Sequence, residues 1–228
     1  MILDLFSAFE PKTYIMSLNL SLNWLSSLLT LLFIPCLFWV SINRISSIFE
    51  MVLSFLLKEF KIIVKNKQYS GILLFISLLC FILLNNFLGM FPYIFTSSSH
   101  LSFSLVFSLS LWMSFMIFGW VNFTKFMFAH LVPSGTPAVL MPFMVCIESI
   151  SNFIRSGTLA VRLSANMISG HLLLSLLGNQ GSSLSIILCL ILIILQLALL
   201  SLEFSVCFIQ SYVFTVLSAL YSSESVGH

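Results

Sequence analysis

The sequence predicts an all-α membrane protein with about five membrane helices and one amphipathic helix in the membrane interface. Hydrophobic residues make up 60% of the 228 residues, charged residues make up 7%, and the mean hydropathy is +1.14. A soluble domain of this composition would have to cover its surface with Phe and Leu, so a soluble protein is excluded. The length allows five apolar stretches of about 20–25 residues, enough for five crossings of a bilayer. We therefore expect one polytopic membrane domain over residues 1–228.

Three stretches have the length of single membrane spans: residues 18–40, 72–95 and 101–121. The first contains Pro35, which should bend the helix because proline removes a backbone donor. The second ends at Pro92 in a serine-rich turn, and the third leads into a proline-rich connection.

Between the first two spans, residues 44–67 change in character. Apolar residues recur there at helical spacing, beside a basic edge formed by Lys58, Lys61 and Lys65. This pattern is typical of an amphipathic helix that lies in the interface. A basic loop is the alternative.

The last two predicted helices, residues 138–177 and 184–221, are too long for upright spans. Each has 38–40 residues, or about 57–60 Å of helix at 1.5 Å per residue. This is nearly twice the hydrocarbon thickness, so we expect a steeply tilted hairpin.

The distribution of basic residues predicts the orientation. The segment after the first span holds five of the nine Lys and Arg residues, whereas the loops around Ser97–His100 and Asn179–Ser183 hold none. Basic loops stay on the inner side of a membrane, so the N-terminus should lie outside and the C-terminus inside.

The fourth predicted span carries polar residues inside an apolar helix. Glu148, Arg155 and Arg162 are spaced by seven, which turns only about 20° per step and places them on one stripe. Asn166 lies within about 40° of Arg162, and His171 lies on the opposite side of the helix. An Arg at a helix centre costs about 2.5–3.5 kcal/mol on insertion scales, so it must be paired, hydrated or used.

The fifth predicted span carries a second polar stripe. Gln196, Glu203 and Gln210 again step by seven. Because a short turn joins the two long helices, these stripes should belong to neighbouring helices. Ionisable residues inside membranes are rare and usually mark ion or proton pathways.

Structural roles are the alternative for each residue taken singly. Asn166 and the two glutamines could be interhelical hydrogen-bond partners, and Glu148 with Arg155, or Arg162 with Glu203, could form structural ion pairs. His171 could be a satisfied core histidine. The five cysteines have no CxxC spacing and are expected to be packing residues, not metal or redox ligands. The complete polar set favours a pathway over these separate roles.

The polar motifs also carry a family resemblance. CIESISNFIR, AVRLSAN, GHLL and LEFSVCFIQSYVF occur in order, together with LNNFLGMFPYIFT and FAHLVPSGTPAVLMPF. These motifs cover essentially the whole chain, which resembles subunit a of the F-type ATP synthases, mitochondrial type, and invertebrate members most.

The resemblance implies a non-catalytic stator subunit in the mitochondrial inner membrane that conducts protons to and from carboxylates of a rotor ring. The expected partners are c-type ring subunits, other membrane and peripheral-stalk subunits, and the lipid bilayer. ATP chemistry would take place on partner subunits. No cofactor and no nucleic acid are expected.

By the same resemblance, Arg162 corresponds to the family's essential arginine. His171 and Glu203 correspond to the pair in the half-channel open to the intermembrane side, and Asn166 and Gln210 to polar positions that flank the arginine.

Glu148 and Glu224 correspond to the half-channel open to the matrix. Two positions depart from the family pattern: Ser156 stands where many relatives carry Pro, and Arg155 is not shared by the whole family, so its role stays open.

Four other classes of membrane protein fit less well. A haem-binding subunit needs paired histidines on facing helices, and only His171 of the four histidines lies in a predicted span. A self-contained transporter often shows internal repeats and broken helices, which are not evident. A proton-pumping respiratory subunit would not explain the two over-long helices, and a structural anchor would not need Arg162, Glu203 and His171.

Overall fold

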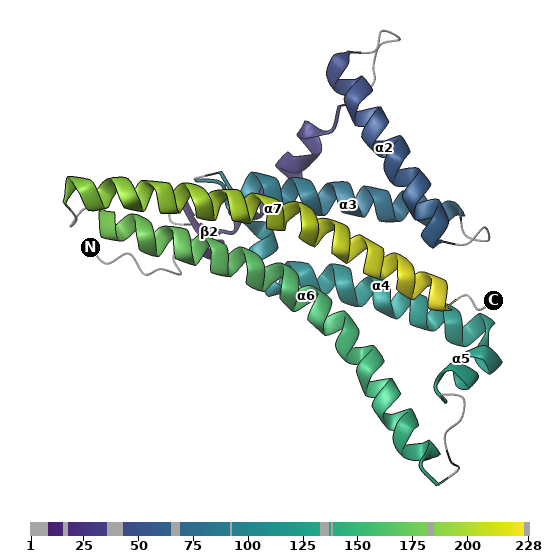
Figure 1. Cartoon of the computed structure of the whole chain (residues 1–228). Coiled ribbons are helices and arrows are strands. Elements are labelled where there is room, and N and C mark those ends of the chain that lie inside the picture. Colours follow the sequence, from purple (N-terminus) through teal and green to yellow (C-terminus); the bar gives the residue numbers. More distant parts are fainter. Residues whose placement is uncertain are drawn as a thin grey trace.

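In the part of the chain that the computed structural model describes, four long apolar helices form the body of the protein (Figure 1), and each is long enough to cross a membrane. They are α3 (Tyr69–Gly89), α4 (Leu101–Asn122), α6 (Met141–Gln180) and α7 (Ile186–Ser225). Helix α7 packs against α3, α4 and α6, and α4 also packs against α6. The structure describes residues 9–15, 18–35, 43–64, 69–91, 93–132, 137, 139–181 and 185–225.

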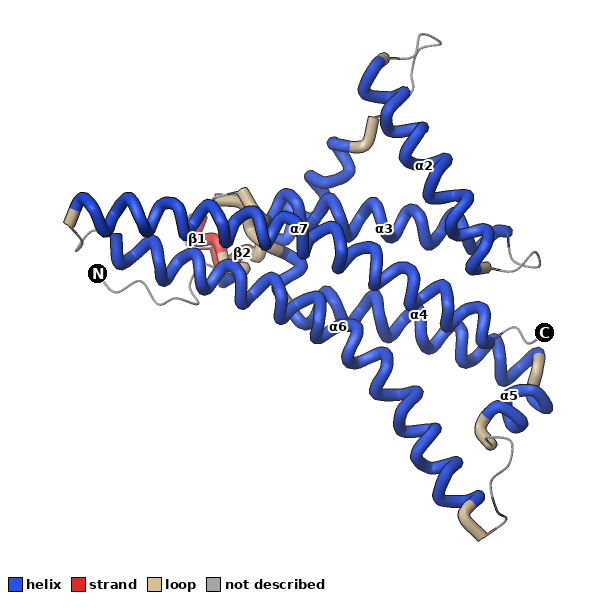
Figure 2. Tube along the Cα trace, viewed as in Figure 1, coloured by secondary structure: helices blue, strands red, loops and turns tan. Residues whose placement is uncertain are grey.

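Helices α6 and α7 each have 40 residues, or about 60 Å of helix. They run side by side where the end of α6 approaches the start of α7, and they diverge toward the start of α6 and the end of α7 (Figure 2). We call these regions the joined end and the open end. Helix α6 continues without a break through Ser156, whose hydroxyl donates to the carbonyl of Phe153 at 2.9 Å. The tilt of this hairpin in a bilayer stays a prediction.

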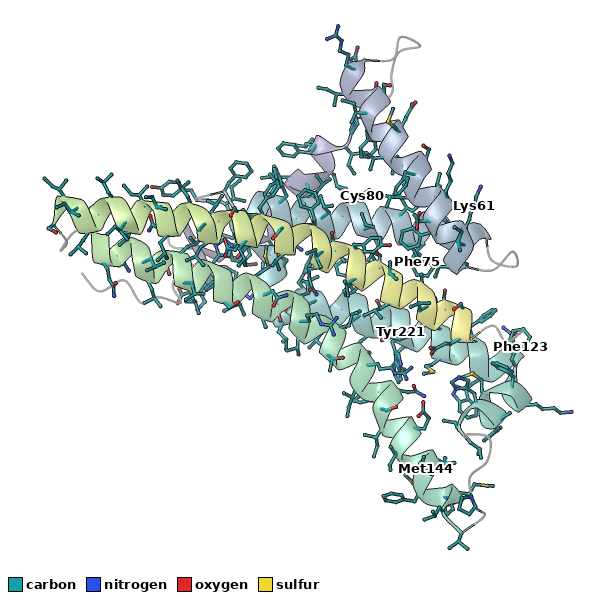
Figure 3. All side chains as sticks on the ribbon, in the orientation of Figure 1. Lys61, Phe75, Cys80, Phe123, Met144 and Tyr221 are labelled. Carbon is teal, nitrogen blue, oxygen red and sulfur yellow. The ribbon has the colours of Figure 1, made fainter. Side chains whose placement is uncertain are left out.

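Two apolar clusters hold the helices together. Phe60, Phe75 and Ala219 join the packed side of α2 (Arg44–Ile63) to α3 and α7, and Figure 3 labels Phe75 at this contact. Ile82 and Phe214 belong to the second cluster, which joins α3 and α7 to α6. Because lipid tails are as apolar as these side chains, it is van der Waals packing that favours such contacts inside a bilayer.

The segment expected as the first span, residues 18–40, is not one continuous helix in its described part. It begins as strand β2 (Leu18–Leu20), which pairs antiparallel with β1 (Thr13–Ile15). Three short helical pieces follow, η2 (Leu22–Leu25), α1 (Ser26–Leu29) and η3 (Thr30–Phe33). The hydroxyl of Ser27 donates to the carbonyl of Trp24 at 2.8 Å, and that of Thr30 to the carbonyl of Ser27 at 2.6 Å. Bonds of the same kind occur along the unbroken α6, so they do not explain the breaks. Residues 36–42 lie outside the described part.

The amphipathic segment expected over residues 44–67 forms α2, which ends at Ile63; Lys65 lies outside the described residues. One part of its apolar surface packs on α3 and α7. Another part, with Ile45, Ile48 and Phe55, is exposed. Its position in a membrane interface stays a prediction.

The second predicted span ends earlier than residue 95, because α3 stops at Gly89. A Cβ at Gly89 would lie 2.9 Å from Cγ2 of Thr96, so a larger residue here would force Thr96 to shift. Tyr93, with φ 71°, lies in the turn that leads from α3 into η4 (Ser97–Ser99). Helix α4 agrees closely with the predicted third span. The sequence did not predict the short helix α5 (Thr124–His130).

Candidate functional site

The polar stripe of α7 meets α6 where the two helices run side by side. Glu203 lies directly against Gly170, and a Cβ built on this glycine would overlap the Glu203 carboxylate. Both residues line a cavity of about 150 Å³, with Asn166, Ser169, Met167 and four apolar side chains of the two helices. A small residue at a helix interface lets the neighbouring helix approach closely. Because Gly170 has no side chain, the Glu203 carboxylate can lie against α6 beside the cavity.

Three buried polar atoms at this site have no hydrogen-bond partner among the described residues: Glu203 Oε2, His171 Nε2 and Gln210 Nε2. The other end of the Gln210 amide is satisfied, because Asn166 Nδ2 donates to Gln210 Oε1 at 3.2 Å. A buried polar group without a partner costs about 1–3 kcal/mol. Of these three residues, Glu203 lines the cavity together with Asn166 and Ser169, so a water molecule there has polar partners.

His171 follows Gly170 on α6, so its Cα lies about 3.8 Å from that of a residue in contact with Glu203. It does not belong to the cavity lining. Its imidazole instead makes an edge contact with the ring of Phe9, with ring centroids 6.3 Å apart. A direct partnership between His171 and Glu203 stays a prediction.

Arg162 is an exposed residue in the middle of α6. No carboxylate of the described residues lies within 4.0 Å of its guanidinium, since Arg155–Glu224 is the single ion pair there. The alternative of a structural Arg162–Glu203 pair therefore has no support. Arg162 lies between two polar groups along α6, with Gly170 about 12 Å away in one direction and Arg155 about 10 Å in the other.

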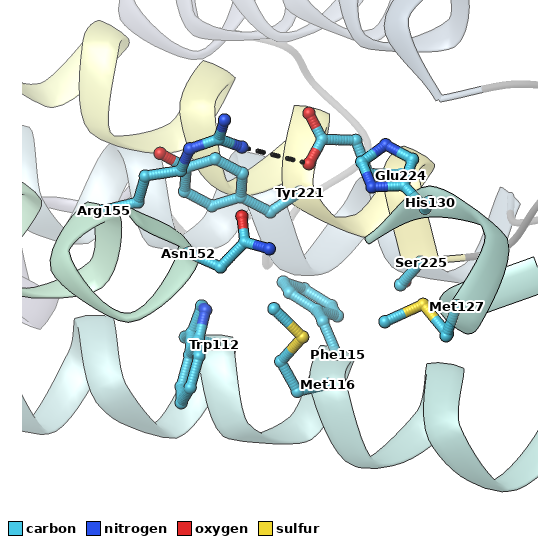
Figure 4. Close-up of a pocket in the computed structure, with 10 residues that line it drawn as sticks. All are labelled: Trp112, Phe115, Met116, Met127, His130, Asn152, Arg155, Tyr221, Glu224 and Ser225. Carbon is cyan, nitrogen blue, oxygen red and sulfur yellow. Dashed lines mark hydrogen bonds and ion pairs between the residues drawn. The ribbon is translucent and has the colours of Figure 1, made fainter. Parts of the chain in front are cut away.

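The second polar group lies at the open end (Figure 4). Arg155 Nη1 approaches Glu224 Oε2 at 3.5 Å, and both side chains are nearly half exposed. The pair borders a cavity of about 40 Å³ that is also lined by Asn152, His130 and Tyr221. This contact gives Arg155 a partner on α7, in place of Glu148, the structural partner considered above.

Glu148 and Gln196 occupy the outer positions of the two stripes. Glu148 lies on α6 seven residues before Arg155, and it has no ion-pair partner among the described residues. Gln196 faces α6 at a second glycine, because its Nε2 would lie 3.7 Å from a Cβ on Gly178. Glycines of α6 thus oppose two successive members of the polar stripe of α7.

Sequence reasoning missed Gly170, Asn152, His130 and Tyr221. The run Ser-Gly-His beside a polar stripe could have drawn attention to Gly170, because glycine is poorly suited to a helix interior unless packing requires it. Asn152 precedes Arg155 by one turn and shares its face. His130 and Tyr221 gave no signal in the sequence, because only the fold brings α5 and α7 to this cavity.

Neither polar group has the composition of a metal centre. Within the described part of the chain, no cluster of three or more His, Cys, Asp and Glu residues is arranged to hold a metal ion. Four cysteines there are free thiols, and Cys207 Sγ lies 3.7 Å from Met90 Sδ in apolar surroundings.

Helix packing and buried ionisable groups thus define a polytopic all-α membrane protein. A family model described as ATP synthase A chain matches residues 20–223. ATP synthase subunit a of Drosophila mauritiana is 58% identical over 225 residues, and that of Anopheles quadrimaculatus is 60% identical over 227 residues. Each match covers 98% of this chain and 99% of the relative.

The chain belongs to the ATP synthase A chain family. Members are non-catalytic membrane subunits with a role in proton translocation, and the insect relatives indicate a mitochondrial membrane. The sequence-based family prediction is confirmed.

Proposed function

We propose that the chain carries protons through two offset half-channels to and from carboxylates of a rotor ring in the mitochondrial inner membrane. Glu203, His171, Asn166 and Gln210 belong to the half-channel that opens outward. The ring and the other membrane and stalk subunits of ATP synthase are its partners. In this orientation the N-terminus lies in the intermembrane space and the C-terminus in the matrix.

The inner half-channel uses Glu148 and Glu224. These carboxylates receive the proton released from the ring, and Arg155 holds Glu224 beside the cavity at the open end. Along α7, Glu203 and Glu224 are separated by 21 residues, or about 31 Å. A proton therefore cannot pass from one carboxylate to the other without a carrier.

Arg162 separates the two half-channels and acts on that carrier. Arginine stays protonated in proteins and does not relay protons. Its fixed charge lowers the pKa of a passing ring carboxylate, which then releases its proton. Each proton that crosses the membrane yields about 2.3 kcal/mol per 100 mV.

One observation carries this proposal: an exposed arginine without a carboxylate partner in the described chain lies between two polar groups, each beside a cavity. A charge kept unpaired in a membrane helix is costly. A partner on another subunit supplies the compensating charge.

The test is proton-driven ATP synthesis by the assembled complex carrying Arg162→Lys. Lysine keeps the charge but loses the planar, weakly hydrated fork and can be deprotonated. We expect ATP synthesis to be abolished while the complex assembles. The matched control is Arg44→Lys, at an exposed arginine at the start of α2, which should leave synthesis unchanged. Near-normal ATP synthesis by the Arg162→Lys complex would show that Arg162 has only a structural role as a positive charge.

A further inference from the structure

Tyr221 of α7 belongs to the polar group at the open end. It precedes Glu224 by three residues, so the two side chains are neighbours on the surface of the helix. Both line the cavity of about 40 Å³ that Arg155 also borders (Figure 4). One side of Tyr221 therefore faces the Arg155–Glu224 pair.

The other side of Tyr221 packs against α6 on the way to Arg162. Tyr221 also lines a second cavity, of about 10 Å³. Leu159 lines this cavity from α6, where it lies four residues after Arg155 and three before Arg162. The phenol interacts electrostatically with Glu224 and with both arginines. Tyr221 thus reaches α6 between the two arginines.

A proton needs a bridging group to pass from the level of Arg162 to Glu224. Arg155, which holds Glu224, lies about 10 Å along α6 from Arg162. Proton transfer requires heavy atoms within about 2.6–3.2 Å, or one water between them. The second cavity is only at the lower limit for one water molecule. A side chain that can both donate and accept a hydrogen bond is therefore required here.

The Tyr221 hydroxyl is the group at this level whose hydrogen is uncommitted. The serine hydroxyls beside the second cavity each donate to a backbone carbonyl of their own helix; these are Ser108, Ser156 and Ser218. The Tyr221 hydroxyl makes no hydrogen bond within the described part of the chain. A phenol both donates and accepts hydrogen bonds. Tyr221 can therefore accept on one side and donate on the other.

We propose that the Tyr221 hydroxyl relays protons from a ring carboxyl at Arg162 to the Glu224 carboxylate. This inference rests on the proposed function. The ring carboxyl gives its proton to the phenol oxygen while the phenol gives its own proton to a Glu224 oxygen. The tyrosine is neutral before and after the step, the ring carboxylate becomes negative beside Arg162, and Glu224 becomes neutral. Rotation of the hydroxyl about its C–O bond resets the relay.

The first test is Tyr221→Phe in the assembled, membrane-reconstituted complex, because it removes the hydroxyl and keeps the ring. We expect passive proton flux to fall about tenfold, less than the roughly 10²-fold of a titrating proton-transfer group, since water takes over part of the transfer. The matched control is Tyr212→Phe. Tyr212 is also on α7, is 43% exposed and lines neither cavity, so its variant should keep parental flux.

The second test separates a relay from a packing role. Tyr221→Ser keeps a hydroxyl and opens space for water, but it loses the packing of the ring. A relay predicts higher flux for the Ser variant than for the Phe variant. A packing role predicts the opposite order, because Phe fills the same volume as Tyr. Flux is measured per assembled complex, and if Tyr221→Ser does not assemble, Tyr221→Phe against Tyr212→Phe decides the question.

Two outcomes would overturn the relay without touching the proposed function. One is parental flux in Tyr221→Phe, and the other is higher flux in the Phe variant than in the Ser variant. In either case the two half-channels stand if Glu203→Gln lowers flux in the same assay. Normal flux in Glu203→Gln would instead refute the proposed function itself.

Discussion

The two polar groups on α6 and α7 each contain a carboxylate of α7, but only one of these carboxylates has an ion-pair partner among the described residues. Where the helices run side by side, Glu203 faces a cavity of about 150 Å³ and has no ion-pair partner among the described residues. At the open end, Glu224 is paired with Arg155 beside a cavity of about 40 Å³, and both side chains are nearly half exposed. Of these two carboxylates, the unpaired one lies where the helices run side by side and the paired one lies where they diverge (Figure 2).

The physical cause of this difference is the residue opposite each carboxylate. Gly170 brings the backbone of α6 against Glu203 and leaves no long side chain to reach it. Arg155 spans the wider gap between the diverging helices, which only a long side chain can bridge. An unpaired carboxylate is suited to exchange protons with water, whereas a paired one is held in place.

The largest effect is expected from Glu203→Gln, which keeps the shape of the side chain and removes its titration. Proton flux should fall by about 10²-fold, the contribution typical of a positioned proton-transfer group, while the complex still assembles. Passive proton flux through reconstituted complex measures the change. Loss of assembly would favour a structural role for Glu203, and unchanged flux would remove it from the path.

Gly170→Ala should have the next largest effect, because the new Cβ overlaps the Glu203 carboxylate. Overpacking of this kind shifts neighbouring side chains. The Glu203 carboxylate would leave its position beside the cavity, and we expect proton flux to fall. Gly178→Ala is the control on the same face of the helix: its Cβ would meet Gln196 Nε2 at 3.7 Å, an ordinary contact. Equal effects of the two substitutions would contradict the proposed role of Gly170.

Asn166→Ala tests whether the joined end is hydrated. It removes the 3.2 Å bond to Gln210, which is 6% exposed. If water already satisfies Gln210 Nε2, water can also take the place of the Asn166 amide. The stability of the complex should then fall by about 1 kcal/mol, the low end of the cost of an unpaired buried group. Thermal inactivation of the detergent-solubilised complex is the measurement. A loss of about 3 kcal/mol would indicate a dry interface instead.

The smallest effect is expected at the open end. A double-mutant cycle on Arg155→Met and Glu224→Gln should give a coupling free energy of about 0.2–1 kcal/mol, because exposed ion pairs are screened by water. The same inactivation assay measures it, and added salt should reduce it. A salt-independent coupling above this range would mean that the pair is buried in the assembled complex.

Local patterns predicted much of the helical part of the fold. The bounds of α4 lie within one residue of the predicted span, and α6 and α7 lie within four residues at each end. The first span was predicted least well, because apolar composition over residues 18–40 does not distinguish a continuous helix from a strand followed by short helical pieces. Of the site, the sequence predicted the seven-residue stripes and their helices, but not the contacts between them.

The sequence by itself determined the class of protein, the long apolar helices and the polar stripes, because hydropathy and helical periodicity are properties of adjacent residues. Only the tertiary structure decided which polar groups meet. Gly170 and Glu203 are 33 positions apart, Asn166 and Gln210 are 44 apart, and Arg155 and Glu224 are 69 apart. Such pairs depend on how far two helices lie from each other at each level, and that separation is set by the side chains packed between them.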